Sequence, residues 1–219
     1  INLYHQEYPE PTYKIKEYCQ EIDIEFLESD LPKLIESMEF GADRIREIVL
    51  SLRNFSRLDE SDKKQVNIHQ GLESTLTVLE NRFVLADGQK IEIRRKFGDL
   101  PLVECYAGHL NQVFFNIIGN AIDALQESRK DVKYIKIETT QIDERWISIE
   151  IADNGMGMNE EVRHHIFDPF FTTKPVGQGT GLGLSSSYKI IVDRHQGKLK
   201  CNSTIGEGTK LIIEIPTTC

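Results

Sequence analysis

The period of the hydrophobic pattern changes once along the chain, at a charged segment that spans residues 56–64. Before it, across residues 31–55, apolar side chains recur at alternating steps of three and four, which predicts a long helix with one apolar seam. After it, apolar and polar side chains alternate in 90–97, 134–142 and 146–153, as they do in half-buried strands. The chain is therefore expected to combine a helical part with a part that contains a β-sheet.

The apolar seam of the helical part consists of Leu31, Leu34, Met38, Gly41, Ala42, Ile45, Ile48, Val49, Leu52 and Phe55. Such a seam packs against another helix of a bundle or of a second copy of the chain. The same pattern also fits a single amphipathic helix packed on its own domain. A further helix is expected near residues 13–28, and the polar segment SRLDESDKK is interpreted as a hinge or linker.

The part that contains the sheet interleaves helices with strands. Helices are predicted near 68–86, 107–128, 159–166 and 182–195, and the strands KLKCNST and TKLIIEIP follow them. This order predicts an α/β fold of the two-layer sandwich type, in which helices cover one face of a mixed sheet.

The composition narrows the possible partners. The formal net charge is -9, and no cluster of Lys and Arg offsets it, so neither nucleic acid nor an anionic membrane is expected as the main partner. No apolar run approaches the roughly 20 residues that span a bilayer, and no signal peptide is evident, so a cytoplasmic location is expected. The four cysteines lack CxxC spacing, which argues against a zinc knuckle or a disulfide framework. The chain begins at Ile1, which suggests a piece of a longer protein.

Four segments carry unusual polar or glycine residues. Asn116, Asn120 and Asp123 fall at i, i+4 and i+7 of a predicted helix and share one face, which alone would fit a solvated stripe. A predicted strand ends in Asp153, and the following DNGMGM has two glycines where a plain turn needs one, so the backbone can approach a ligand closely.

The other two segments follow in the sequence. Residues 167–174 (FDPFFTTK) fit either a core corner made of phenylalanines or the hinge of a mobile loop. Residues 177–184 (GQGTGLGL) place alternating glycines at the start of a helix, where exposed N–H groups form a natural anion site. One segment of this kind would be weak support for a function, but four in this order indicate a phosphate-binding site.

These segments resemble the N, G1, F and G2 boxes of sensor histidine kinases, in the form NIIGNAIDA (116–124), DNGMGM (153–158), FDPFFTTK (167–174) and GTGLGL (179–184). The same superfamily contains DNA gyrase, mismatch-repair MutL and the large heat-shock chaperone ATPases, which implies the Bergerat ATP-binding fold. The resemblance covers residues 65–216. In addition, residues 31–58 resemble the second helix of the kinase dimerisation and phosphotransfer hairpin, particularly that of cyanobacterial kinases.

The resemblance implies three parts: residues 1–58 as a partial dimerisation and phosphotransfer region, 59–66 as a linker, and 67–219 as the catalytic ATP-binding domain. The implied reaction moves the γ-phosphate of Mg²⁺-bound ATP to a histidine, leaves ADP, and passes the phosphate on to a response-regulator receiver domain. The implied assembly is a homodimer through the helical stalk, with no nucleic acid and no membrane segment in these residues.

The resemblance also implies roles for single residues. Asn120, helped by Asn116, would place a side-chain oxygen on Mg²⁺, which prefers oxygen ligands. Asp153 would accept a hydrogen bond from the adenine amino group and favour ATP over GTP, because a carboxylate repels the O6 acceptor of guanine. The full nucleotide-binding set is Asn116, Asn120, Asp123, Asp153, Gly155, Gly157, Met158, Phe167, Thr173, Lys174, Gly179, Thr180, Gly181, Leu182, Gly183, Leu184 and Thr209.

Within this set, the resemblance places the glycines and one lysine against the ligand. Gly155 and Gly157 would let the base and sugar lie on the backbone, with Thr209 beneath the adenine pocket. The glycines of 179–184 would cradle the phosphates, and Lys174 would reach them as a point charge.

Two positions depart from related families. The hydrolysing branches carry a water-activating Glu where this chain has Asn116, whose amide takes no proton near neutral pH, so transfer is expected rather than hydrolysis. Many membrane sensor kinases carry Lys or Arg where this chain has Asp123, so the phosphate charge must be neutralised from elsewhere.

In the family that the chain resembles, the phosphoacceptor histidine is followed directly by an acidic residue and by a proline five residues later. His5 has its acid at Glu7 and its proline at Pro9, so the acceptor histidine is not found in the chain. The other histidines, at 69, 109, 164, 165 and 195, are expected to be surface or capping residues. Two other classes stay open, namely another enzyme of the superfamily, such as a serine kinase or an ATPase clamp, and a non-enzymatic nucleotide-binding scaffold. Asn116 weighs against the first class, and the intact motifs weigh against the second.

Overall fold

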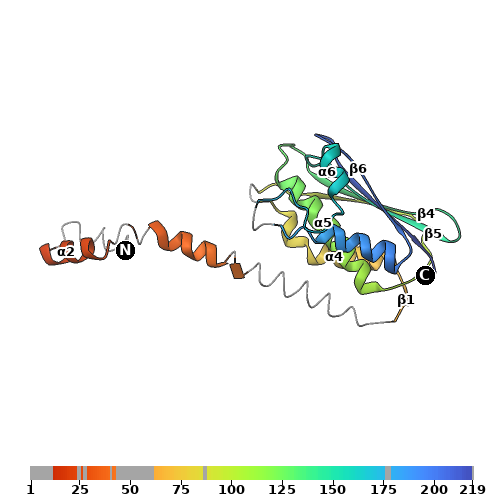
Figure 1. Ribbon diagram of the computed structural model, residues 1–219, viewed down its shortest axis with the longest axis horizontal. Coiled ribbons are helices and arrows are strands. Elements are labelled where there is room, and N and C mark those ends of the chain that lie inside the picture. The colour runs from red at the N-terminus through yellow and green to blue at the C-terminus, as the bar shows by residue number, and fades with distance from the viewer. Residues whose placement is uncertain are drawn as a thin grey trace. The chain divides into compact units, whose positions relative to one another are not determined.

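The computed structural model of the chain describes residues 12–23, 26, 29–39, 41–42, 62–85, 88–175 and 179–218 (Figure 1). The chain divides into two units, Ile1–Ser56 and Arg57–Cys219, and each is described by itself.

The described residues of the first unit are mostly helical. Helix α2 (Tyr13–Glu21) covers the start of the helix predicted near 13–28, and residues 29–39 and 41–42 are helical as well. The apolar seam side chains Leu31, Leu34 and Met38 are all more than half exposed. The seam residues Ile45 and Leu52 lie outside the described residues, and packing of the seam against a second copy stays a prediction.

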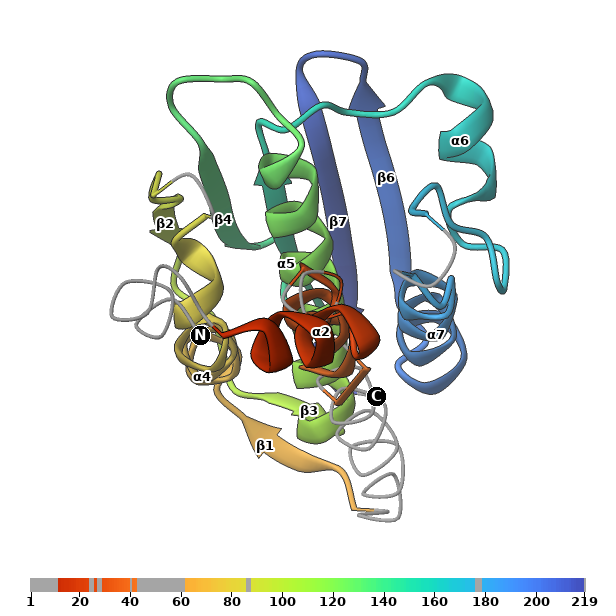
Figure 2. The same cartoon turned by 90° about the vertical axis from the view of Figure 1, so that its left-hand side faces the viewer.

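The second unit contains a five-stranded sheet in the order β2-β4-β5-β7-β6. Its strands are β2 (Glu92–Phe97), β4 (Tyr134–Gln141), β5 (Trp146–Asp153), β6 (Lys198–Thr204) and β7 (Gly208–Pro216). Strands β2 and β4 run parallel and the other neighbours antiparallel, so the sheet is mixed as predicted. Figures 1 and 2 show α4 (Ile68–Val78), α5 (Ala107–Gln126) and α7 (Gly183–Lys189) on one face of this sheet, which confirms the two-layer α/β sandwich.

The core lies between α5 and the sheet. Helix α5 turns Val113, Ile117, Ile118, Ile122 and Leu125 inward, and each is at most 1% exposed. The alternation in β4 and β5 places Ile135, Ile137, Ile147, Ile149 and Ile151 opposite them, at most 2% exposed. Burying one such aliphatic side chain contributes about 1.5–3 kcal/mol, so this contact fixes α5, and the polar residues on its other face, against the sheet.

Two predicted helices differ from the observed ones. The helix predicted near 68–86 ends at Val78 and continues as the 3₁₀ turn η2 (Glu80–Phe83), because the chain then turns back and Val84 pairs with Lys90. The helix predicted near 182–195 widens into the π-helical turn η3 (Ile190–Arg194). There His195 donates both its backbone N–H, at 3.2 Å, and its Nδ1 hydrogen, at 2.9 Å, to the carbonyl of Ile190, which stabilises the wider turn.

A small second sheet was not predicted. It pairs β1 (Lys64–Val66) with β3 (Val103–Cys105), antiparallel, and β1 begins inside the segment 59–66 that was expected to be a linker. Strands of three residues are too short to show an alternating pattern, which explains why the sequence does not indicate them.

The expectation that the five later histidines are surface or capping residues is wrong for two of them. His109 is 4% exposed and His195 is fully buried. His195 Nε2 accepts the backbone N–H of Tyr106 at 3.2 Å, so its ring is neutral with the hydrogen on Nδ1. Burial, aided by the charge of Arg194, lowers the pKa of His109 to about 4, so this ring is also neutral at physiological pH.

Candidate functional site

The predicted motifs converge around α5, which packs against both β5 and α7. Asp153 ends β5 and lies directly opposite Thr209 of β7 in the strand register. The residues Asn116 and Asp123 of α5 reach α7 and the segment 167–174 through side-chain hydrogen bonds. Motifs that are up to about ninety residues apart in sequence therefore meet at one side of the second unit.

Asp153 is held in a largely buried position. Its Oδ1 accepts the backbone N–H of Gly155 at 2.8 Å. Burial raises the pKa of its carboxyl to about 6, and hydrogen bonds from the N–H groups of Gly155 and Thr209 partly offset that rise. The side chain is therefore ionised above pH 6, where it can accept hydrogen bonds but cannot donate one.

The neighbouring Asn154 fixes the start of the glycine loop. Its Oδ1 accepts the backbone N–H of Tyr134 and its Nδ2 donates to the carbonyl of Val132, both at 2.8 Å. These bonds tie the loop to the start of β4. The sequence pattern assigns Asn154 no role, because its partners are backbone groups that no motif identifies.

Contacts within the protein require glycine at two positions of this loop. Gly157 has φ +67°, and a Cβ on it would collide with the carbonyl oxygen of Thr204 and lie 2.7 Å from the carbonyl carbon. A Cβ on Gly155 would lie 2.9 Å from the carbonyl oxygen of Ala124. Close packing on α5 and on the β6–β7 turn thus already requires glycine, whether or not a base and sugar lie here, as the resemblance implies.

Ser203 of β6 links the two sides of this loop, although the sequence did not point to it. Its Oγ accepts the backbone N–H of Met158 at 2.8 Å and donates to the carbonyl of Gly208 at 3.0 Å. It also lies 3.0 Å from the hydroxyl of Thr209. Met158 and Thr209, both predicted site residues, are therefore joined through one hydroxyl group.

On α5 the two asparagines differ in what they contact. Asn116 Nδ2 donates to the carbonyl of Gly183 at 3.0 Å and to Ser187 Oγ at 3.2 Å, so it ties α5 to α7. Asn120, one turn later and half-buried, makes no side-chain hydrogen bond to any residue in the described ranges. Among the described residues, the Asn120 amide forms no side-chain hydrogen bond, whereas Asn116 uses its Nδ2 for two bonds and accepts none through its Oδ1.

Asp123 is paired with two cations. Its Oδ1 lies 2.7 Å from Nη2 of Arg82, and its Oδ2 forms an ion pair with Nζ of Lys174. Lys174, expected to reach a phosphate, instead contacts a carboxylate here. Arg82 brings a positive charge to this face of α5, which the sequence did not indicate because η2 lies outside all four motifs, and neutralisation of the phosphate charge stays a prediction.

The segment 167–174 packs against the glycine run. Phe170 donates its backbone N–H to the carbonyl of Gly181 at 2.9 Å, and Gly181 has φ +65° where it touches the Phe170 backbone. The ring of Phe167 packs on Tyr188, with centroids 5.2 Å apart, while Phe170 is 74% exposed. The core-corner interpretation therefore fits Phe167 and not Phe170.

The remaining predicted residues of these segments have ordinary surroundings. Thr173 and Thr180 are exposed, Leu182 is 43% exposed, and Leu184 packs partly against the core. Residues Gly177 and Gln178 lie outside the described residues.

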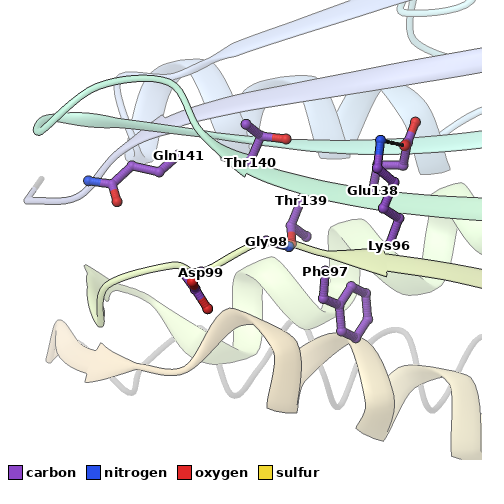
Figure 3. A pocket seen from close by; sticks show the side chains of 8 residues that line it. All are labelled: Lys96, Phe97, Gly98, Asp99, Glu138, Thr139, Thr140 and Gln141. Carbon is purple, nitrogen blue, oxygen red and sulfur yellow. Dashed lines mark hydrogen bonds and ion pairs between the residues drawn. The ribbon is translucent and has the colours of Figure 1, made fainter.

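A groove of about 370 Å³ lies away from all these residues, at the edge formed by β2 and β4 (Figure 3). Here β2 ends at Phe97 and Gly98 still donates its N–H to the carbonyl of Thr139, while β4 continues to Gln141. Of its charged lining residues, Glu138 forms ion pairs with Lys96 and with the neighbouring Lys136, and their hydrogen bonds lower the pKa of the Glu138 carboxyl. None of the predicted site residues lines this groove.

Comparison with known proteins identifies the fold and the family. Residues 106–218 match the family described as histidine kinase-, DNA gyrase B-, and HSP90-like ATPase. The chain is 34% identical over 175 residues to the signal transduction histidine-protein kinase AtoS of Escherichia coli, a match that covers 80% of this chain and 27% of that protein. It is 33% identical over 199 residues to the sensor kinase CckA of Brucella abortus, with 83% and 20% covered.

Among solved structures, the catalytic domain of the histidine kinase ThkA is similar, with a TM-score of 0.61 and 30% identity over 72% of this chain and 97% of that one. The likeness to cyanobacterial kinases stays a prediction, since AtoS and CckA come from other bacteria. No helix within the described ranges is long and apolar enough to cross a membrane. The chain belongs to the histidine kinase-, DNA gyrase B- and HSP90-like ATPase family, and within it carries the catalytic domain of a sensor histidine kinase.

Proposed function

We propose that this domain binds Mg²⁺-bound ATP and transfers its γ-phosphate to a histidine on an upstream helix, in a larger, cytoplasmic protein. The acceptor histidine would pass the phosphate to an aspartate of a response-regulator receiver domain, and the first unit would form part of a homodimeric stalk. The chain spans about a quarter of the length of AtoS, so the activity of the whole protein is part of this proposal.

The observation that carries the proposal is the packing of β5 against α5. Strand β5 ends in the ionised, largely buried Asp153, and α5 carries Asn120, whose amide forms no hydrogen bond within the described residues. Asp153 would recognise adenine, because its carboxylate accepts from the amino group and repels the O6 of guanine. Asn120 would hold Mg²⁺ through its amide oxygen, which suits a hard ion whose charge the phosphates already balance.

Transfer is favoured over hydrolysis by the surroundings of Asn116. Its Nδ2 is committed to Gly183 and Ser187, and an amide cannot remove a proton from water. Phosphoryl transfer depends mainly on holding the acceptor in line with the phosphate and on neutralising charge, so a domain of this kind requires no base of its own. ADP would leave after the transfer.

The test uses the longer natural protein that includes the upstream helix. Incubation with γ-labelled ATP and Mg²⁺ should give an acid-labile, base-stable label on histidine. Asn120→Ala should abolish the label, whereas Asn111→Ala, an exposed amide on the same helix, should leave it. Residues 1–219 alone should bind ATP without labelling themselves. Rapid ATP hydrolysis by this chain, lost in Asn116→Ala, would contradict the proposal and support an ATPase.

A further inference from the structure

Three charged side chains from three separate segments form one cluster at the phosphate end of the proposed site. Arg82 comes from η2, Asp123 from α5 and Lys174 from the loop that follows α6 (Glu160–His165). Asp123 contacts both cations, one with each carboxylate oxygen. Two positive charges thus share one negative charge, and the cluster has a net charge of about +1 at neutral pH.

The cluster lies next to the proposed metal ligand. Asp123 is three residues after Asn120, so the two side chains are neighbours on one face of α5. Arg82 crosses the same turn, with its Nη1 3.4 Å from where a Cβ on Gly119 would be. Both cations therefore lie beside the turn that would carry the metal and phosphates.

Lys174 is also joined to the glycine run. A Cβ on Gly179 would lie 3.3 Å from both Cβ and Cδ of Lys174, and 2.6 Å from Oγ1 of Thr172. The aliphatic part of Lys174 thus packs on the described part of the glycine run, while its ammonium group reaches α5. The position of this cation is coupled to the segment expected to contact phosphates.

Stability alone does not explain a carboxylate at this position. The three side chains are 26–37% exposed, and ion pairs with this much solvent contact typically contribute about 0–1 kcal/mol. A carboxylate here would repel the phosphates of a nucleotide and occupy the two cations best placed to bind them. It therefore opposes the ligand that the rest of the site is suited to bind.

We propose that Asp123 is an internal counter-anion that holds Arg82 and Lys174 beside the metal-binding turn and competes with the nucleotide phosphates for both cations. This inference rests on the proposed nucleotide binding. Arg82, which lies outside the four motifs, becomes a phosphate-binding residue. The competition makes the affinity depend on phosphate charge, because a ligand with more phosphate displaces the carboxylate more effectively.

The test is calorimetric titration at low salt of residues 1–219 with ATP, ADP and adenosine, each with Mg²⁺. Asp123→Asn should tighten ATP binding on the order of threefold to tenfold, ADP binding less, and adenosine binding not at all. Arg82→Gln should weaken ATP binding by a similar factor, and by more in the Asp123→Asn background, where the cation is no longer occupied. Raising the salt concentration should reduce all of these effects.

Arg95→Gln is the matched control. Arg95 forms an ion pair of 2.7 Å with Glu73 away from the site, the same length as the pair between Arg82 and Asp123. It should leave all three affinities unchanged. Thermal unfolding of each variant should confirm that the fold is intact.

Weaker ATP binding in Asp123→Asn would overturn the inference, since the carboxylate would then serve the metal or nucleotide directly. Equal changes for ATP and adenosine would also overturn it, because the effect would not act through phosphate. If the wild type binds neither ATP nor adenosine, the proposed function itself fails. This outcome is distinguishable from the two results that overturn only the inference about Asp123.

Discussion

The base end and the phosphate end of the proposed site are held by different kinds of contact. At the base end, Asp153 lies in strand register with Thr209, Asn154 bonds to two backbone groups, and Gly157 touches the backbone of the β6–β7 turn. At the phosphate end, Arg82 and Lys174 reach Asp123 from separate segments through long, partly exposed side chains.

This difference separates the two tasks of the site. Recognition of the base depends on groups that also define the sheet, so changes there should alter stability and binding together. Charge at the phosphate end depends on side chains whose removal costs the fold little. Substitutions at the two ends should therefore have distinguishable effects, which the following predictions test in order of size.

The largest effect is expected for Gly157→Ala. The new methyl group would collide with the carbonyl of Thr204 at a backbone φ of +67°, so we expect a loss of unfolding free energy of about 3 kcal/mol or more. Urea unfolding monitored by circular dichroism measures it. Gly108→Ala is the control, because a Cβ there meets nothing within 4 Å and alanine favours α5 by up to about 1 kcal/mol. Equal stability of the two variants would refute the tight base end.

A smaller effect, of opposite sign, is expected for Asp153→Asn. The folded-state pKa of about 6 exceeds the ordinary 3.8, so the stabilising contribution of the protonated group is complete below pH 4 and is lost as pH rises through 6. Above pH 7 the buried charge destabilises the fold by up to about 3 kcal/mol. The variant should therefore be more stable than wild type at pH 8, by roughly 1–3 kcal/mol, because the amide carries no charge.

The pH dependence of that difference is the sharper measurement. Unfolding of both proteins in urea from pH 4 to pH 8 isolates the Asp153 contribution, since every other group is shared. The gap between variant and wild type should grow through pH 6. A gap that is constant with pH would mean that the carboxyl is not destabilised by burial.

The sequence predicted the elements with strong periodicity. Strands β4 and β5 lie within one residue of their predicted ends, because each alternates cleanly between a buried and a solvated face. The three-residue strands β1 and β3 have no such period. The π-helical turn at Ile190 was missed because it depends on a bond from the His195 ring, which tertiary packing creates.

The site was predicted to the extent that its motifs are local. The glycines after Asp153 and the helical spacing of Asn120 mark these two residues in the sequence. In the structure β5, which ends in Asp153, packs against α5, which carries Asn120. Arg82 and Ser203 lie in no motif. The partner of Arg82, Asp123, is 41 residues away, and Ser203 bonds to Gly208, five residues later, across the β6–β7 turn. The buried His109 was misjudged because its position at the start of α5 suggested exposure, whereas the packing of Tyr106 and His195 against it decides its burial.

The most direct test of nucleotide recognition is titration at pH 8 with Mg²⁺-bound ATP and GTP, comparing wild type, Asp153→Asn and Asp99→Asn, an exposed acid in a distant loop. Wild type and Asp99→Asn should bind ATP more tightly than GTP. In Asp153→Asn, ATP binding should weaken roughly tenfold to a hundredfold, as expected when a buried polar group is left unpaired at a cost of about 1–3 kcal/mol, and the discrimination against GTP should shrink. Unchanged ATP affinity and unchanged discrimination in Asp153→Asn would contradict the assignment of the base site.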